Sequence, residues 1–108
     1  MGWNKVTEVE TLKKQIKLKV FVNDLALLLI YDQNRVYAIN DRCPHLGASL
    51  EKGTYDDGVV TCAKHHAQID VKTGEVLEKA KILFLKMPTK KTKTYETKIE
   101  EGTVFVKV

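Results

Sequence analysis

The residues of this sequence that can bind a transition metal are concentrated in one short stretch. Both cysteines and all three histidines lie between positions 43 and 66. Four of them form the pattern Cys43-x-His45, sixteen residues, and then Cys62-x-x-His65. Thiolates favour zinc, copper and iron–sulfur clusters, whereas neutral imidazole suits zinc and iron. The spacing therefore predicts one metal centre held by two short loops, each of which supplies one thiolate and one imidazole.

Two kinds of metal centre fit this donor set. The first is a structural zinc ion with two Cys and two His ligands. The second is a [2Fe–2S] cluster in which two histidines replace two cysteines on one iron. A third interpretation needs no metal and treats these residues as buried cysteines and scattered surface histidines. The regular pairing of ligands in both loops argues against this third interpretation.

The sequence around the ligands resembles the Rieske family. The resemblance is carried by CPHLGASL at 43–50 and GTYDDGVVTCAKHHAQIDVKTGEVL at 53–77, and it extends over residues 26–80. A common zinc finger instead places its two cysteines together and its two histidines together on a helix. The resemblance implies one [2Fe–2S] cluster, with Cys43 and Cys62 on one iron and His45 and His65 on the other.

Four positions differ from the respiratory and photosynthetic Rieske subunits, which resemble C-T-H-L-G-C and C-P-C-H-G-S-x-Y. Ala48 and Lys64 stand where those proteins have the two cysteines of a bracing disulfide, so no such bridge is expected here. Ala67 and Ile69 stand where those proteins have hydroxyl groups that donate hydrogen bonds to the cluster. Because fewer donors leave the reduced cluster less stabilised, we expect a reduction potential at the low end of the Rieske range. These positions favour the branch of low-potential soluble ferredoxins.

His66 replaces the glycine that usually follows the second histidine ligand in that family. One interpretation makes it a proton-coupled or docking residue at the edge of the cluster. The other, which we favour, is an exposed histidine that only tolerates the turn. A shift of one residue would make His66 the ligand, but the Cys-x-x-His spacing and the symmetry of the two loops favour His65.

Short strands separated by turns are predicted to position these loops. Residues 16–22 alternate polar and apolar side chains, residues 25–31 form an apolar run, and residues 35–39 form a third strand-like segment. The polar turn at 32–34 predicts a hairpin between the last two. Further turn signals precede the strand-like runs at 59–62, 75–77 and 103–108.

One short helix is predicted at residues 9–15, with Thr7 as its N-cap and Glu10 three residues later. The segments 40–55 and 61–69, which hold every candidate ligand, do not look like strands. We therefore expect a mostly β fold, a small antiparallel β-sandwich or barrel domain of the Rieske type, with cluster-binding loops at about 41–48 and 61–69. A packing role is sufficient for the tryptophan and the aliphatic stripes (Trp3, Val20, Val22, Leu27, Leu29, Val36, Ile39, Val104 and Val106).

Length and composition limit the other possibilities. The chain has 108 residues, which predicts a single domain over 1–108. Two cysteines cannot form a disulfide framework, so a small secreted disulfide-rich scaffold is excluded. The longest apolar run, residues 25–31, is far too short to span a membrane, and the N-terminus lacks the apolar core of a signal peptide. We expect a soluble, cytoplasmic monomer.

Basic residues gather in one part of the chain. Residues 79–95 contain six lysines, from Lys79 to Lys93, and no acidic residue. This segment is either a docking patch for an acidic redox partner or a solvated edge that lysines protect from aggregation; we favour the second interpretation. Nucleic-acid binding is not expected, because the chain has only two arginines, Arg35 and Arg42, and no aromatic residues interleave with the lysines.

The resemblance implies a one-electron carrier rather than an enzyme. Its partners would be a flavin or NAD(P)H-linked reductase as donor and an oxygenase or other oxidoreductase as acceptor, docking near His45 and His65. An oxygenase iron needs two His and a carboxylate, and only His66 remains after the cluster takes its ligands. The alternatives are the small subunit of a larger reductase, such as a nitrite reductase, and a redox-silent zinc-binding adaptor.

Overall fold

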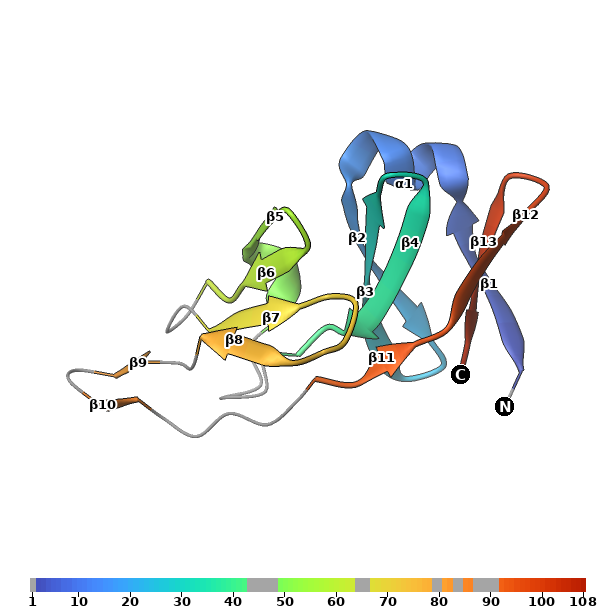
Figure 1. The fold of residues 1–108 in the computed structure, drawn as a ribbon. Coiled ribbons are helices and arrows are strands. Elements are labelled where there is room, and N and C mark those ends of the chain that lie inside the picture. The colour runs from blue at the N-terminus through green and yellow to red at the C-terminus, as the bar shows by residue number, and fades with distance from the viewer. Residues whose placement is uncertain (1, 43–48, 64–66, 79–80, 83–84, 87–91) are drawn as a thin grey trace.

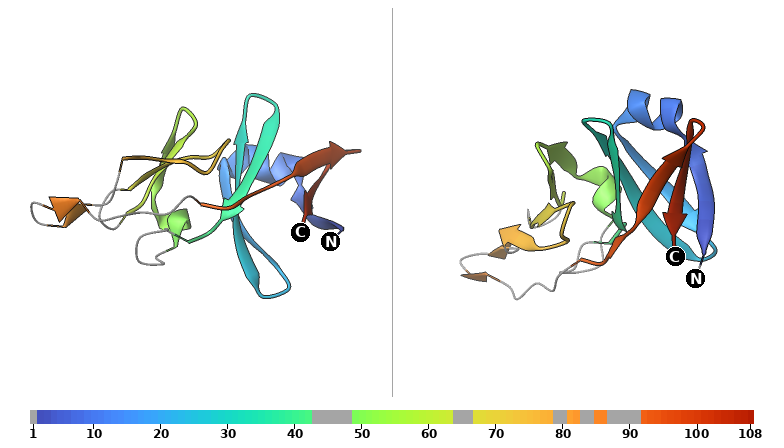
Figure 2. Two further views of the ribbon diagram at one scale, coloured as in Figure 1. Left: turned by 60° about the horizontal axis from the view of Figure 1, so that its bottom comes forward. Right: turned by 45° about the vertical axis from the view of Figure 1, so that its right-hand side comes forward.

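The chain folds into stacked antiparallel sheets (Figures 1 and 2). The computed structural model describes residues 2–42, 49–63, 67–78, 81–82, 85–86 and 92–108. In chain order its elements are β1 (Trp3–Glu8), α1 (Val9–Gln15), β2 (Lys17–Val22), β3 (Leu25–Asp32), β4 (Arg35–Asn40), the 3-10 turn η1 (Leu50–Lys52), β5 (Thr54–Asp56), β6 (Val59–Thr61), β7 (Gln68–Asp70), β8 (Val76–Glu78), β9 (Lys81–Ile82), β10 (Leu85–Lys86), β11 (Thr94–Tyr95), β12 (Thr97–Glu100) and β13 (Thr103–Lys107).

Three sheets form the body of the protein. The outer sheet has the strand order β1-β13-β12, the central sheet β11-β4-β3-β2, and the site sheet β5-β6-β7-β8. The short hairpin β9-β10 lies beyond the site sheet in Figure 1. Every strand pair is antiparallel, which confirms the predicted fold class.

The central sheet is buried on both faces, and β3 shows this most clearly. Leu28 and Ile30 belong to a core cluster shared with the site sheet. Leu27 and Leu29 belong to a second cluster shared with α1 and the outer sheet. All four side chains have no exposed surface. Since successive side chains of a strand point to opposite faces, a strand covered on both sides must be apolar at every position, as predicted for residues 25–31.

The predicted turns are confirmed by backbone conformation. Gln33 and Asn34 both have positive φ, 50° and 66°, and join β3 to β4 in a two-residue hairpin. Positive φ at both central positions matches the twist of the flanking strands. Asp57-Gly58 and Glu101-Gly102 repeat this conformation at the β5–β6 and β12–β13 hairpins.

The predicted helix is confirmed over Val9–Gln15, but its predicted N-cap is wrong. Glu8 is the N-cap residue and makes no side-chain capping bond. Thr7 instead lies in β1, paired with Val104. The helix buries Leu12 against the second core cluster and ends where Ile16 adopts a φ of 68°. Contacts with the sheets therefore hold this two-turn helix in place, as is usual for helices too short to be stable alone.

Two further expectations need correction. Short strands β5 and β7 extend into the segments 40–55 and 61–69, which the sequence did not mark as strands. These strands have only three residues each, so the sequence carries too few positions for a periodic signal. Trp3 is 40% exposed on the outer sheet, where its ring lies 4.6 Å from the Lys98 Nζ atom, so it is not a core residue.

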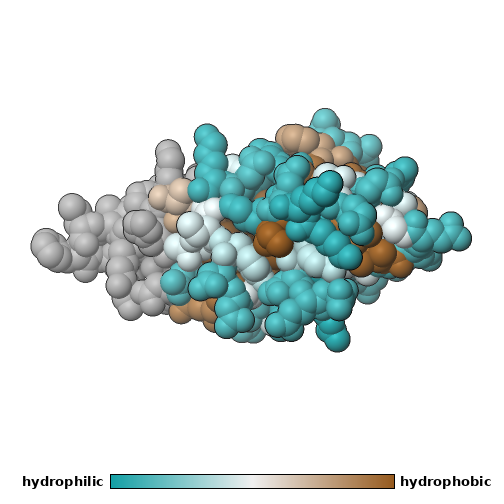
Figure 3. Space-filling view, turned by 90° about the horizontal axis from the view of Figure 1, so that it is seen from above, coloured by the Kyte–Doolittle hydropathy of each residue, from teal (hydrophilic) through white to brown (hydrophobic). Residues whose placement is uncertain are grey.

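The face seen from above is mainly hydrophilic over the described residues (Figure 3). Seen from above, apolar side chains appear as separate patches among hydrophilic ones (Figure 3). Phe21 and Leu77 are the most exposed of the large apolar residues in the described ranges, at 64% and 53%. No helix in these ranges is long and apolar enough to cross a membrane.

Candidate metal centre

Cys62 is the candidate ligand whose position the structure describes. It follows β6 directly, is 1% exposed, and packs in the core cluster between the central and site sheets. Its backbone N–H donates a hydrogen bond of 2.8 Å to the carbonyl oxygen of Ala67. That bond joins the two ends of the β6–β7 loop, the segment in which the sequence places His65.

The other three candidate ligands lie outside the described residues. Cys43 and His45 fall in residues 43–48, and His65 falls in residues 64–66 together with His66. Ala48, Lys64 and most of the predicted lysine patch lie outside the described residues too. Apart from Cys62, the structural evidence on the ligand set therefore comes from the described residues that flank the two predicted loops.

Residues that flank both predicted loops meet in one core cluster. Leu50, just after the first loop, has no exposed surface and belongs to the same cluster as Cys62 and Ala67, at the two ends of the second loop. Leu50 is thus brought together with residues 12 and 17 positions later in the sequence, at one end of the site sheet. This is the convergence that a centre with ligands from two loops requires.

The donor set suits an iron–sulfur cluster. A buried thiol at the start of a closed hairpin loop gives a soft ligand in a water-poor environment. With neutral imidazoles, two thiolates and two sulfides balance the charge of two ferric ions, so an added electron meets little repulsion. Cys43, His45, Cys62 and His65 would hold the cluster, which supplies a reversible one-electron carrier when bound.

Ala67 and Ile69 have no exposed surface and pack in the cluster that contains Cys62. Their side chains have no polar atoms, so neither can donate a hydrogen bond to a nearby sulfur. The interpretation of these two positions as missing hydroxyl donors is therefore consistent with where they lie.

Sequence reasoning missed two polar groups next to the site. Asp41 is 6% exposed, directly follows β4 and is the first residue of the first predicted loop. Lys19, on the edge strand β2, places its Nζ atom 3.2 Å from the Asp41 Oδ2 atom. The available signal was an acidic residue that directly follows the apolar strand β4, together with two alternate lysines in β2, the edge strand of the same sheet.

A part-buried polar contact joins the site sheet to the central sheet. The Tyr55 hydroxyl donates a hydrogen bond of 2.5 Å to Asp32 Oδ2, and it accepts one of 3.0 Å from the backbone N–H of Gly58. Burial and the hydrogen bond to the Asp32 carboxylate raise the pKa of Tyr55 well above its ordinary value of 10.0. The phenol is therefore kept protonated in the folded protein.

The shifted pKa of Tyr55 predicts a loss of stability in alkaline solution. Above pH 10 the unfolded chain releases the phenolic proton while the folded protein retains it, so the free energy of unfolding falls as pH rises. Tyr55→Phe should make this fall shallower in chemical unfolding measured between pH 9 and pH 12. Tyr31→Phe, which removes a more exposed hydroxyl bonded to Asn34, is the control. Equal slopes in the wild type and Tyr55→Phe would contradict the prediction.

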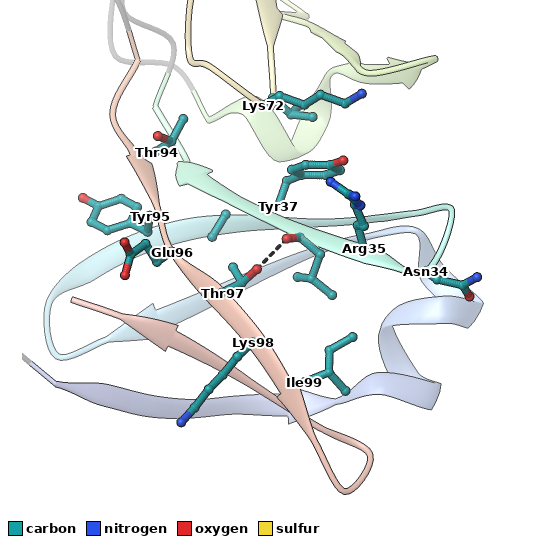
Figure 4. Close-up of a pocket in the computed structure, with 13 residues that line it drawn as sticks. Asn34, Arg35, Tyr37, Lys72, Thr94, Tyr95, Glu96, Thr97, Lys98 and Ile99 are labelled. Carbon is teal, nitrogen blue, oxygen red and sulfur yellow. Dashed lines mark hydrogen bonds between the residues drawn. The ribbon is translucent and has the colours of Figure 1, made fainter.

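A separate groove of about 630 Å³ runs along β4, β11 and β12 (Figure 4). Thr97 Oγ1 donates a hydrogen bond of 2.6 Å to the Val36 carbonyl oxygen there. Arg35 and Tyr37 point from β4 toward Lys72 in the close-up. Among its described lining residues there is no Cys or His, so these residues offer no ligand to the metal centre.

The described fold is that of a small β protein, and its candidate ligands lie in two predicted loops. The chain belongs to the Rieske [2Fe–2S] domain family, whose family model matches residues 2–84. One [2Fe–2S] cluster is the cofactor of this family, so the zinc alternative is not supported.

Known relatives agree with this assignment. The 3-phenylpropionate/cinnamic acid dioxygenase ferredoxin subunit of Shigella flexneri is 38% identical over 71 residues, which is 65% of this chain. The match spans 60% of the length of that relative.

Solved structures confirm the fold. The ferredoxin of carbazole 1,9a-dioxygenase from Nocardioides aromaticivorans superposes with a TM-score of 0.82 over 98% of this chain and 97% of that one, at 21% identity. A chain of the complex of reduced oxygenase and oxidised ferredoxin in carbazole 1,9a-dioxygenase is 28% identical and has a TM-score of 0.79. That match covers 96% of this chain and 91% of the other.

Proposed function

We propose that this protein is a cytoplasmic one-electron carrier that receives electrons from a flavin or NAD(P)H-linked reductase and delivers them to an oxygenase or another oxidoreductase. Cys43 and Cys62 bind one iron of the cluster, and His45 and His65 bind the other. The observation that carries the proposal is the closed β6–β7 loop, in which buried Cys62 shares one core cluster with Leu50.

Described residues near the centre support this function in two ways. The apolar side chains of Leu50, Ala67 and Ile69 exclude water from the base of the loops. The hydrogen bond between Cys62 and Ala67 fixes the loop that presents His65. Fixed loop ends lower the reorganisation that accompanies a change of charge, which suits a carrier that takes up one electron and then releases it.

The relatives support the proposed partners. The Shigella flexneri relative is a ferredoxin subunit of a dioxygenase, and the 28% identical structural neighbour comes from a complex of oxygenase and ferredoxin. The test uses the full chain purified with its native cofactor. We expect visible absorption, an EPR signal on reduction, and catalysis of cytochrome c reduction when NADH and a flavin-containing ferredoxin reductase are supplied. A colourless, EPR-silent protein that contains zinc would overturn the proposal.

The reduction potential should lie at the low end of the Rieske range of roughly −150 to +300 mV. Ala67 and Ile69 supply no hydroxyl donors, so the extra negative charge of the reduced state is less stabilised. Voltammetry on the same preparation measures this potential. A value in the upper half of the range would contradict the prediction, even if the protein carries electrons.

A further inference from the structure

The carboxylate of Asp41 is buried next to the predicted ligand segment. Its side chain has no exposed surface, although Arg42 and Ser49 on either side of residues 43–48 are at least partly exposed. Removing a carboxylate from water is costly unless hydrogen bonds and an opposite charge compensate for the lost hydration. The groups that contact this carboxylate therefore show which parts of the fold it holds together.

Those partners come from residues that follow the ligand segment and from β2, the edge strand of the central sheet. Ser49 Oγ donates a hydrogen bond of 2.5 Å to Asp41 Oδ2, and the backbone N–H of Glu51 donates one of 2.8 Å to Oδ1. Lys19 Nζ lies 3.2 Å from Oδ2. One carboxylate thus ties the residue before the segment to two residues after it, and the β2 lysine supplies the opposite charge.

A second lysine of β2 holds the same region from the same side. Lys17 Nζ donates hydrogen bonds to the carbonyl oxygens of Glu51, at 2.8 Å, and Gly53. Lys17 and Lys19 are two positions apart in a strand, so their side chains leave the same face of the sheet. The turn η1 is therefore held to the edge of the central sheet by two lysines as well as by Asp41.

We propose that Asp41 is a positioning residue for the cluster: with Ser49, Glu51 and Lys19, its carboxylate closes the base of the first ligand loop. We call these four residues the Asp41 clip. The inference rests on the proposed function, because it takes Cys43 and His45 as ligands. A closed base keeps the two ligands of this loop within reach of the second pair, so an opened clip should release the cluster faster.

The test compares variants that open the clip with a variant that weakens the fold elsewhere. Asp41→Asn and Ser49→Ala each remove a clip contact, whereas Ser49→Thr keeps the hydroxyl. Leu12→Ala creates a cavity in the second core cluster, on the opposite side of the central sheet. Asp24→Asn removes an exposed carboxylate from the β2–β3 turn and serves as the charge control.

The measurement is the rate at which visible absorption is lost in excess EDTA, at a temperature well below unfolding. We expect Asp41→Asn to lose its cluster ~10-fold faster than the wild type, in line with the effect of residues that support metal ligands. Ser49→Ala should also lose its cluster faster than the wild type, and Ser49→Thr should restore the slow rate of loss. The EPR g values should shift in Asp41→Asn and stay constant in Leu12→Ala and Asp24→Asn.

The Asp41–Lys19 pair allows a sharper comparison. Removing one partner of a buried ion pair leaves an uncompensated charge, whereas replacing both partners is much less costly. Lys19→Met alone should therefore accelerate cluster loss, and the double variant Lys19→Met/Asp41→Asn should be slower than the product of the two single effects predicts.

Different results overturn the two proposals. If the wild type contains no cluster, the proposed function fails. Hydrogen exchange over residues 42–52 then tests the closed base by itself. Faster exchange in the cluster-free Asp41→Asn variant than in the wild type supports the closed base, and equal exchange overturns it. If the wild type contains the cluster, and Asp41→Asn loses it at the wild-type rate or no faster than Leu12→Ala, the positioning role is wrong.

Discussion

Cys62→Ser is expected to yield a protein without the visible absorption and EPR signal of the [2Fe–2S] cluster. The serine hydroxyl stays protonated near neutral pH and is a poor substitute for the thiolate that iron–sulfur clusters favour. The substitution also lowers stability, because cofactor binding to the folded state alone adds to the free energy of folding. A ligand present at 1,000 times its dissociation constant contributes about 4 kcal/mol in this way.

A matched pair of variants separates the loss of a ligand from damage to the core. Cys62 is buried among apolar side chains, so Cys62→Ser also places a hydroxyl in the core, whereas Cys62→Ala does not. Both variants should lack the cluster, and Cys62→Ser should be the less stable of the two. Ala63→Ser adds a hydroxyl at the exposed neighbouring position and should keep the cluster. A coloured Cys62→Ala protein would show that Cys62 is not a ligand.

The sequence was most informative where one short pattern determines a local structure. The apolar run at 25–31 predicted a buried strand, and β3 is covered on both faces. Asn34, Asp57 and Gly58 are residue types that tolerate the positive φ found at the β3–β4 and β5–β6 turns, whereas Gln33 adopts it because the two-residue hairpin requires it. The ligand spacing was equally local, since each pair lies within four residues, and it led to the family that the chain belongs to.

Contacts between distant segments were not predictable in the same way. Sequence analysis gave Asp41 no separate role, and its contacts appear only when Lys19, twenty-two positions earlier in the sequence, is folded against it. Tyr55 and Asp32 are likewise 23 residues apart and meet where the site sheet crosses the central sheet. Thr7 has the residue type of an N-cap, but it pairs with Val104 of β13, and the N-cap position falls one residue later, on Glu8. Tertiary packing therefore decided the polar contacts that support the site.

Gly53→Ala is expected to disrupt the junction between η1 and the site sheet. Gly53 is buried, and a Cβ atom at this position would lie 2.0 Å from the carbonyl oxygen of Thr61. The backbone of Gly53 is extended, with φ of −81°, so the obstacle is the close approach of β6 rather than an unusual conformation. Thr61 cannot move away without displacing Cys62, the next residue. The variant should lose about 3 kcal/mol of unfolding free energy, at the upper end of the usual cost of overpacking, and should bind less cluster.

Two other glycines provide the controls for this clash. Gly58 has a φ of 83° and open space where a Cβ would lie, so Gly58→Ala measures conformational strain alone, about 1 kcal/mol. Gly2 has open space as well, and Gly2→Ala should change stability by less than about 0.5 kcal/mol. Chemical unfolding of the three variants, with iron content measured on the same samples, should rank Gly53→Ala as the most damaging and the only one depleted in iron. If Gly53→Ala retains both stability and iron, the close approach of β6 to this glycine does not support the cluster loop.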